Sequence, residues 1–297
     1  MTGFLFPGQG SQAPGMGADF YAASTPARDI LDRAAAMAES GWLDILLQGT
    51  DAELADTRMA QPALLAVEVA IAAHLKENGL TPSFCAGHSL GEYPALVAAG
   101  ALTFEEAFRL VRERARVMSE DVPEGAMAAV IGLDAAAIEP LLPEGAQVAN
   151  YNGPNQTIIS GTVPAVEASE TALKEAGAKR VMRLNVSGPF HSECMRAARD
   201  TFREILQHAV LKPPAIRFVS SISGTDETDP ERIRDLLGEQ LCAPVRWTEV
   251  MAALGPVDAL EVGPGRVLQG LAKRTENAPR VTPVGALEAA EALGETP

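Results

Sequence analysis

Apolar and polar positions along the chain predict strands that alternate with helices. A short apolar run at 3–6 is typical of a buried strand, and it leads into a glycine-rich turn at 7–12. Further elements are expected in this order: helices at 26–48 and 60–78, a strand at 81–87, helices at 91–98 and 104–121, and, toward the carboxyl end, a helix at 193–209, a strand at 216–220, a helix at 230–241 and a strand at 259–262. This alternation indicates a mostly parallel sheet with helices on both faces.

The segment between these two groups has a different order of elements. Strands are predicted at 126–132, 146–151, 157–161 and 179–186, and helices at 134–142 and 163–176. This β-α-β-β-α-β order is that of the ferredoxin-like motif. We therefore predict an α/β fold in which residues 1–124 and 189–297 form a large domain and residues 125–188 an inserted ferredoxin-like small domain. The tail after about residue 286 is expected to be frayed.

Composition disfavours several classes of protein. With 24 Lys and Arg against 39 Asp and Glu, the net charge of −15 is unfavourable for nucleic-acid binding. No run of about 18 uncharged apolar residues predicts a membrane span, and the first residues lack the pattern of a secretion signal. The three cysteines show no CxxC spacing, and the four histidines form no HxxxH or HExxH pair. We therefore expect a cytoplasmic protein with no nucleic-acid partner, no membrane contact and no metal.

The segment Gly87-His88-Ser89-Leu90-Gly91 matches G-x-S-x-G between a predicted strand and a predicted helix. In that context a sharp turn exposes a serine hydroxyl above the sheet as a nucleophile. The N–H groups at the start of the helix suit a developing oxyanion, so the backbone of Leu90 is one candidate donor. Gln9, in the loop after the first strand, is a candidate for the second donor. The alternative is a glycine-bounded turn that Ser89 caps.

A nucleophilic serine needs a general base, and histidine is a common one. His88 adjoins Ser89 in an extended segment, where neighbouring side chains point in opposite directions. His74 and His208 lie in predicted helices, where a structural role is expected. His191 remains, in a turn-rich stretch after the inserted domain. No Asp or Glu between the serine and this histidine stands out as a third member, which leaves open a dyad oriented by a backbone carbonyl.

One arginine of the helix predicted at 104–121 lies on its apolar side. The neighbours of Arg114 at offsets of three and four residues are Leu110, Val111, Val117 and Met118. Arg109 and Arg116, by contrast, have mostly charged or polar neighbours. A buried cation needs an anionic partner. An internal salt bridge, a snorkelling side chain or a bound substrate carboxylate, such as that of a malonyl thioester, would each meet this need.

The glycine-rich turn also fits a second function. Residues 8–13 match G-x-G-x-x-G/A after a strand, which is the pattern of a dinucleotide-binding fold. That fold needs a second strand ending in an acidic residue about 20 positions further on, whereas 27–48 predicts helix. Pro14 also interrupts the expected helix start. The sequence therefore disfavours a nicotinamide cofactor.

Seven segments together resemble the malonyl-CoA:acyl carrier protein transacylase family. They are 6–12, Gln61-Pro62-Ala63, 87–93, Arg114 with Met118, Asn150-Tyr151-Asn152, 188–192 and 262–265. They occur in family order over nearly the whole chain. The resemblance implies a hydrolase-like large domain with a ferredoxin-like insert. It also implies a ping-pong transfer of malonyl from malonyl-CoA to the phosphopantetheine thiol of a holo acyl carrier protein, by a monomer without a cofactor.

The resemblance implies a catalytic role for five residues. Ser89 would be the acylated nucleophile and His191 its base. The backbone N–H groups of Gln9 and Leu90 would form the oxyanion hole. Gln240 matches the family position whose backbone carbonyl orients the histidine, which would account for the missing acid.

The resemblance also implies a substrate site. Arg114 would bind the malonyl carboxylate, and Met118, Asn152 and Phe190 would belong to the same site. Leu90 and Phe190 look like the malonyl-selective pattern, since methylmalonyl-selective relatives usually carry Gln and Ser there. Phe190 would crowd an added methyl, although one methyl discriminates only about 10- to 200-fold.

Two other functions remain as alternatives. An acyl hydrolase on the same fold is disfavoured because simple acyl chains offer Arg114 no partner, and a noncatalytic carrier-docking module is disfavoured by the intact Ser89 and His191.

Carrier proteins are usually acidic, so docking on this acidic chain calls for a local basic patch. The candidates, which are also compatible with ordinary surface charge, are Lys179, Arg180, Arg183, Arg246, Lys273 and Arg274. The sequence leaves open whether the product serves fatty-acid biosynthesis, polyketide biosynthesis or malonate decarboxylation.

Overall fold

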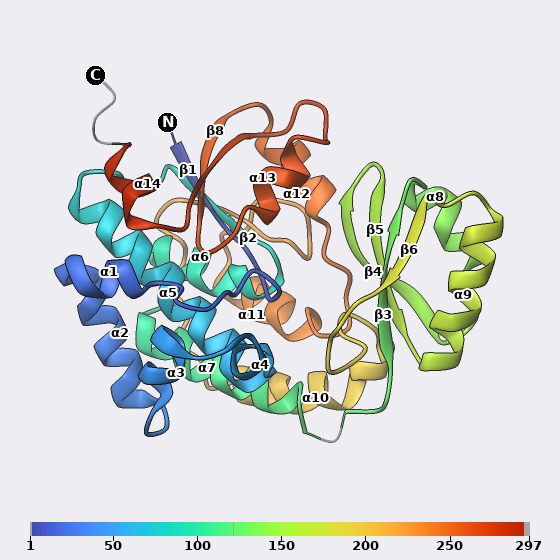
Figure 1. Cartoon of the computed structure of the whole chain (residues 1–297), viewed down its shortest axis with the longest axis horizontal. Coiled ribbons are helices and arrows are strands. Elements are labelled where there is room, and N and C mark those ends of the chain that lie inside the picture. Colours follow the sequence, from blue (N-terminus) through green and yellow to red (C-terminus); the bar gives the residue numbers. More distant parts are fainter. Residues whose placement is uncertain (1, 121, 294–297) are drawn as a thin grey trace.

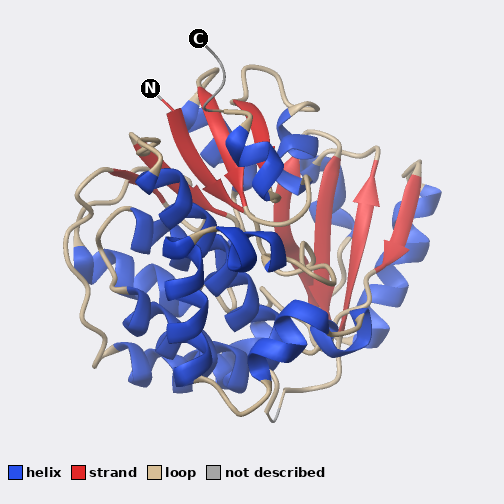
Figure 2. Ribbon diagram, turned by 60° about the vertical axis from the view of Figure 1, so that its left-hand side comes forward, coloured by secondary structure: helices blue, strands red, loops and turns tan. Residues whose placement is uncertain are grey.

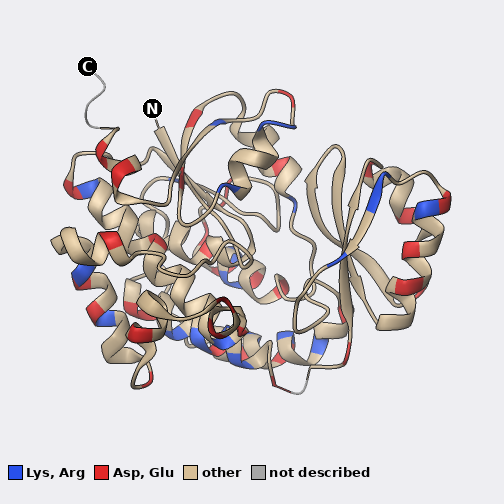
Figure 3. Cartoon of the chain, viewed as in Figure 1, with Lys and Arg blue, Asp and Glu red and all other residues tan. Residues whose placement is uncertain are grey.

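Two sheets organise the chain, and each packs against its own helices (Figure 1). The computed structural model describes residues 2–120 and 122–293. Charged residues lie mainly on the helices and loops, and few lie on the strands at the centre of the molecule (Figure 3). None of the described helices is long and apolar enough to cross a membrane.

The larger sheet is parallel throughout and has the strand order β7-β2-β1-β8-β9. Its strands are β1 (Thr2–Phe6), β2 (Phe84–Gly87), β7 (Arg217–Val219), β8 (Asp258–Val262) and β9 (Arg280–Val284). Phe6 lies opposite Gly87, so the loops after β1 and β2 leave the sheet side by side. The predicted parallel sheet is confirmed, and the edge strand β9, which was not predicted, extends it.

Helices cover both faces of this sheet (Figure 2). They are α1 (Ala18–Ala23), α2 (Thr25–Met37), α3 (Trp42–Gln48), α4 (Asp51–Ala55), α5 (Thr57–Glu77), α6 (Glu92–Ala98), α7 (Phe104–Val117), α10 (Arg196–Leu206), α11 (Pro230–Glu239), α12 (Trp247–Leu254), α13 (Val267–Ala272) and α14 (Leu287–Glu291). Alternate residues of β1 serve the two faces: Phe4 and Phe6 pack in the core with α5 and α7, whereas Leu5 packs with α12 and α13. Because alternate side chains point to opposite faces and helices bury both faces, every position of the run at 3–6 is apolar.

The smaller sheet is antiparallel and has the order β4-β5-β3-β6. It contains β3 (Ala126–Ile131), β4 (Ala146–Gly153), β5 (Gln156–Gly161) and β6 (Arg180–Arg183), with helices α8 (Ala135–Ile138) and α9 (Val163–Glu175). Ala128 and Val130 pack with these helices, while Met127 and Ala129 join the core of the larger sheet's helices. The predicted β-α-β-β-α-β order is therefore present, and the division into two domains stays a prediction.

Several predicted boundaries were wrong. The helix expected at 26–48 is two helices, α2 and α3, because Gly41 in the left-handed region (φ 84°) separates them. Helix α7 ends at Val117, and Asp121, the end expected for it, lies outside the described residues. The strand expected at 179–186 is only β6, after which 184–188 leaves the sheet. Of the tail expected to fray after 286, Leu287–Glu291 forms α14, and residues 294–297 lie outside the described residues.

Candidate active site

Ser89 lies at a sharp turn between β2 and α6, and it begins a short 3-10 turn, Ser89–Gly91. Its φ of 52° is in the left-handed region, which a side-chain-bearing residue adopts only under strain. A Cβ on Gly87 would lie 1.9 Å from the backbone of Gly91, and one on Gly91 would lie 2.2 Å from the carbonyl oxygen of Phe6. The serine therefore carries the strained backbone, and the flanking glycines are needed for close approach. This is the geometry of a nucleophile elbow.

His191 is the histidine that the structure brings to Ser89. Its Nε2 lies 2.9 Å from Ser89 Oγ, and its Nδ1 lies 2.8 Å from the carbonyl oxygen of Gln240 and 3.1 Å from that of Ala243. Because a carbonyl can only accept, Nδ1 carries the proton and Nε2 is free to accept one from the serine. Burial, together with the nearby charge of Arg114, lowers the pKa of His191 to about 3, which keeps the imidazole neutral.

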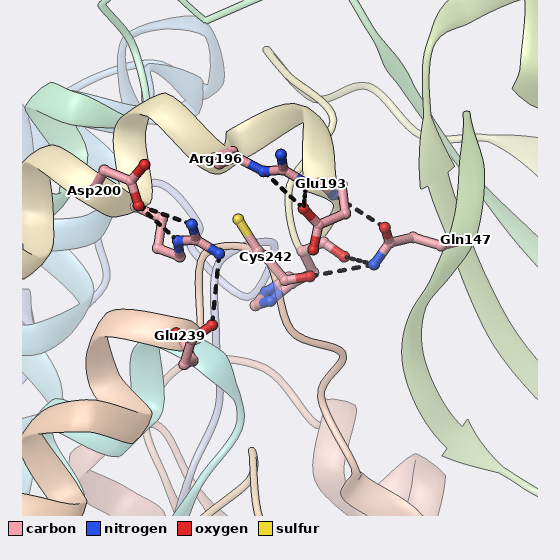
Figure 4. A network of polar contacts seen from close by, with 8 residues as sticks. Gln147, Glu193, Arg196, Asp200, Glu239 and Cys242 are labelled. Atoms are coloured by element: carbon pink, nitrogen blue, oxygen red, sulfur yellow. Dashed lines mark hydrogen bonds and ion pairs between the residues drawn. The ribbon is translucent and has the colours of Figure 1, made fainter. Parts of the chain in front are cut away.

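The His191 loop is held by a side chain of the smaller sheet (Figure 4). His191 itself has a φ of 56°, so its conformation needs support from its neighbours. Gln147 Nε2 donates to the carbonyl oxygens of His191 and Cys242, each at 3.2 Å, and its Oε1 accepts from the backbone N–H of Glu193 at 3.0 Å. One amide on β4 thus joins the histidine loop to the loop that follows Gln240.

Arg114 is 1% exposed and reaches the nucleophile. Its Nη2 lies 3.2 Å from Ser89 Oγ, its Nη1 donates to Gln61 Oε1 at 2.6 Å, and its Nε donates to Gln240 Oε1 at 3.1 Å. Within 2–120 and 122–293, no carboxylate forms a salt bridge with it. The snorkelling interpretation is therefore wrong, and the internal salt bridge does not form among these residues. A buried guanidinium held by neutral oxygens can accept an anion beside the serine.

A cavity of about 420 Å³ connects these groups, a size suited to a small-molecule substrate. Ser89, His191 and Arg114 line it. The remaining predicted substrate residues, Met118, Asn152 and Phe190, also line it. Leu90 and Gln240 are fully buried behind its wall.

The predicted oxyanion donors lie on the two adjacent loops. A Cβ on Gly8 would lie 2.5 Å from the carbonyl oxygen of His88, so the glycine loop touches the elbow. The side chain of Gln9 is occupied by Thr57 and Gln61, while its backbone N–H has no acceptor among the described residues. The side chain of Leu90 belongs to the core, which leaves only its backbone for the site.

Of the other histidines, His88 and His74 have structural contacts, and His208 is exposed in the turn after α10. His88 Nε2 lies 2.9 Å from Asn152 Oδ1, its ring packs on Trp247, and burial lowers its pKa. The hydrogen bond to His88 also orients Asn152 at the cavity wall. His74 Nδ1 lies 2.9 Å from Ser24 Oγ on the far side of α5.

Three residues of this network have no role predicted from the sequence. Gln61 and Glu92 lie in segments that carry the family resemblance, and both are buried in contact with site residues. Gln147 had no signal, because a half-buried glutamine in a strand is unremarkable until the loops it joins are known.

Known proteins similar to this chain share one kind of domain. The family model described as "Acyl transferase domain" matches residues 3–292. The malonyl CoA-acyl carrier protein transacylase of Bacillus subtilis (strain 168) is 45% identical over 282 residues, which are 91% of this chain and 89% of the relative. That of Escherichia coli (strain K12) is 44% identical over 284 residues, 91% of each chain.

Solved structures are similar over almost the whole length. A malonyl-transacylase in complex with its type II PKS acyl-carrier protein has a TM-score of 0.94 at 39% identity, covering 99% of each chain. The MCAT from Streptococcus pneumoniae has a TM-score of 0.93 at 38% identity, again covering 99% of each chain.

Proposed function

The chain belongs to the acyl transferase family, and on that premise we propose that Ser89 carries a malonyl group from malonyl-CoA to the phosphopantetheine thiol of an acyl carrier protein. The protein is an acyltransferase, and the family predicted from its sequence is confirmed. The observation that carries the choice of malonyl is Arg114, a buried cation 3.2 Å from the serine hydroxyl that has no carboxylate partner among the described residues. A dicarboxylic thioester supplies that missing carboxylate.

The first step loads the enzyme. His191 Nε2 takes the proton of Ser89 as Oγ attacks the thioester carbonyl carbon, and the oxyanion points to the backbone N–H groups of Gln9 and Leu90. The tetrahedral intermediate then breaks its C–S bond. CoA leaves as a thiolate and takes the proton from His191, so that a neutral CoA thiol and a malonyl ester on Ser89 remain.

The second step reverses these roles with a different thiol. His191 takes the proton of the phosphopantetheine thiol, whose sulfur attacks the ester carbonyl. When the C–O bond breaks, Ser89 recovers the proton from His191 and the malonyl group stays on the carrier. Both steps are acyl and proton transfers within one dyad, so the proposal includes no cofactor. The carbonyl of Gln240 keeps the imidazole in the required tautomer through both steps.

Arg114 selects and holds the acyl group. A malonyl carboxylate on the guanidinium would sit opposite the ester carbonyl, which positions the ester for the incoming thiol. Met118, Asn152 and Phe190 line the cavity around this acyl group. Phe190 lines this cavity, and the bulk of its ring there supports malonyl over methylmalonyl.

An acyl carrier protein is the partner, and basic residues at the small sheet suit its acidic surface. Of the predicted patch, Arg183 pairs with Glu170 on α9 and Arg246 pairs with Glu249, so these two are partly neutralised. Lys179, Arg180 and Arg274 instead line one surface hollow together. This hollow shares Ile158 and Leu184 with the active-site cavity, which supports carrier docking at its mouth.

A transfer assay distinguishes this function from the alternative acyl hydrolase. Malonyl enzyme, freed of malonyl-CoA, is mixed with holo carrier protein or, as a control, with apo carrier protein that lacks the thiol. We expect malonyl on the holo carrier and little free malonate with the apo carrier. Rapid release of malonate with either carrier would favour the hydrolase.

We further propose that the enzyme acts as a cytoplasmic monomer, and light scattering of the purified chain tests its mass.

A further inference from the structure

A second charged group lies behind the serine, and the two transfer steps do not use it. Glu92 begins α6, three residues after Ser89, and is 1% exposed. Its Oε1 accepts from the backbone N–H of Ser221 at 2.6 Å, and its Oε2 accepts from Gln240 Nε2 at 2.5 Å. Both carboxylate oxygens are therefore used as acceptors, which favours the ionised form. Burial opposes ionisation and raises the pKa of Glu92 to about 7, so the loading rates are compared above that pH.

This carboxylate determines which way the side-chain amide of Gln240 points. The Gln240 Oε1 faces Arg114 Nε, while its Nε2 faces Glu92 and also donates to the carbonyl oxygen of Ser89 at 3.0 Å. Rotating the amide by half a turn would set its NH₂ against the guanidinium and its oxygen against the carboxylate. Both contacts would then be repulsive, so only one orientation is compatible with the two charges.

The amide also separates the two charges. Glu92 and Arg114 are not joined by a salt bridge, and each contacts Gln240 instead. A direct ion pair would occupy the N–H groups that a substrate carboxylate needs. With the amide between them, the carboxylate balances the buried cation at a distance, and the guanidinium side that faces Ser89 stays available.

We propose that Glu92 is a positioning residue for substrate selection, which orients Gln240 and thereby holds Arg114 toward Ser89 without pairing with it. This inference rests on the proposed malonyl transfer. It assigns Glu92 to the recognition of the substrate carboxylate and not to the chemical step, because the proton transfers run through His191. Recognition of the carboxylate and the chemical step can be told apart with two substrates. Recognition affects malonyl, but not an acyl group that lacks a carboxylate, whereas the chemical step affects both.

The experiment compares malonyl and acetyl loading of Ser89 under single-turnover conditions, followed by intact-protein mass. In Glu92→Gln the new amide can still accept from Ser221, but its NH₂ would face the NH₂ of Gln240. We expect malonyl loading to fall about 10- to 100-fold, the range for a lost hydrogen bond to a charged group, while acetyl loading changes less than about 3-fold. A role in folding alone would lower both rates equally, and an unchanged malonyl-to-acetyl ratio overturns the proposal.

A matched control is Glu261→Gln. Glu261 is also fully buried and accepts from two backbone N–H groups, those of Leu268 and Gln269, but it contacts neither the serine nor Arg114. We expect its folded fraction to keep the wild-type malonyl-to-acetyl ratio. A ratio that falls as much as in Glu92→Gln overturns the proposal, because any buried carboxylate would then serve.

The exchange variant Glu92→Gln with Gln240→Glu keeps the total charge and one hydrogen bond between the two positions, and it serves if the single variant fails to fold. It sets a carboxylate directly on Arg114, so malonyl loading should stay at least about 10-fold low relative to acetyl. Wild-type selectivity in this variant overturns the proposal. Failure of the proposed function can be distinguished from failure of this proposal, because the wild-type enzyme would then form no malonyl ester at all.

Discussion

Replacing Arg114 by Met should abolish most malonyl loading and leave the fold intact. Two charge-assisted hydrogen bonds to a carboxylate are worth roughly 3–6 kcal/mol together, or about 100- to 10,000-fold in rate. One guanidinium nitrogen already contacts Ser89 Oγ at 3.2 Å, and that contact is exchanged on binding, so we expect the lower part of this range. A Met side chain is similar in length to Arg. Removing a buried cation that forms no salt bridge among the described residues also removes the free-energy cost of its desolvation, which offsets the lost hydrogen bonds to Gln61 and Gln240. Stability should therefore change by less than about 2 kcal/mol.

The assay measures single-turnover loading from malonyl-CoA and from acetyl-CoA by intact-protein mass, with urea unfolding as the check on stability. Arg116→Met is the matched control, because Arg116 lies on the same helix and pairs with Glu113 and Glu120 at the surface. Acetyl loading by Arg114→Met should fall far less than malonyl loading. Equal losses of both, or malonyl loading within a few-fold of wild type, would refute carboxylate recognition by Arg114.

Three further changes test other parts of the site. Gln147→Leu removes the donor to the carbonyl oxygen of His191. Malonyl and acetyl loading should both fall about 10-fold at saturating thioester, with little change in KM. Wild-type loading rates in this variant would show that the histidine loop does not need this hydrogen bond. Glu68 is fully buried without a hydrogen-bond partner among the described residues, and burial with the nearby Glu261 raises its pKa well above the usual range. The unfolded chain therefore loses this proton at lower pH than the folded chain. As the pH rises, this group lowers the free energy of unfolding by up to about 1.4 kcal/mol per pH unit. In urea titrations between about pH 5 and 8, Glu68→Gln should remove that part of the slope. An identical slope in the variant would contradict the buried protonated carboxyl. Phe190→Ala should raise methylmalonyl loading relative to malonyl by at most about 200-fold, and an unchanged ratio would show that another residue excludes the methyl group.

Local patterns were enough to predict the sharp turn at Ser89 and the burial of Arg114. G-x-S-x-G between a strand and a helix describes a turn whose requirements, a strained serine and space at both glycines, all lie within a few residues. The apolar neighbours of Arg114 follow from the helical repeat alone, and the structure buries this side chain. Such features are set by secondary structure, so the sequence contains them.

Contacts between distant segments could not be predicted in this way. The carbonyl that orients His191 comes from Gln240, 49 residues further along, and only the family resemblance pointed to it. The roles of Glu92 and Gln147 depend on where three loops meet, which no local periodicity describes. The strand β9 was missed because it lies at the sheet edge and contains Pro283, which is unusual within a strand.

In the proposed mechanism Ser89, activated by His191, carries the malonyl group. Its most direct test is the intact mass of the protein after brief mixing with malonyl-CoA, in wild type, Ser89→Ala and His191→Ala. We expect one malonyl adduct in wild type, none in Ser89→Ala and much slower formation in His191→Ala, with the adduct cleared when holo carrier protein is added. A malonyl adduct that persists in Ser89→Ala, or a wild-type enzyme that transfers malonyl without ever forming an adduct, would contradict it.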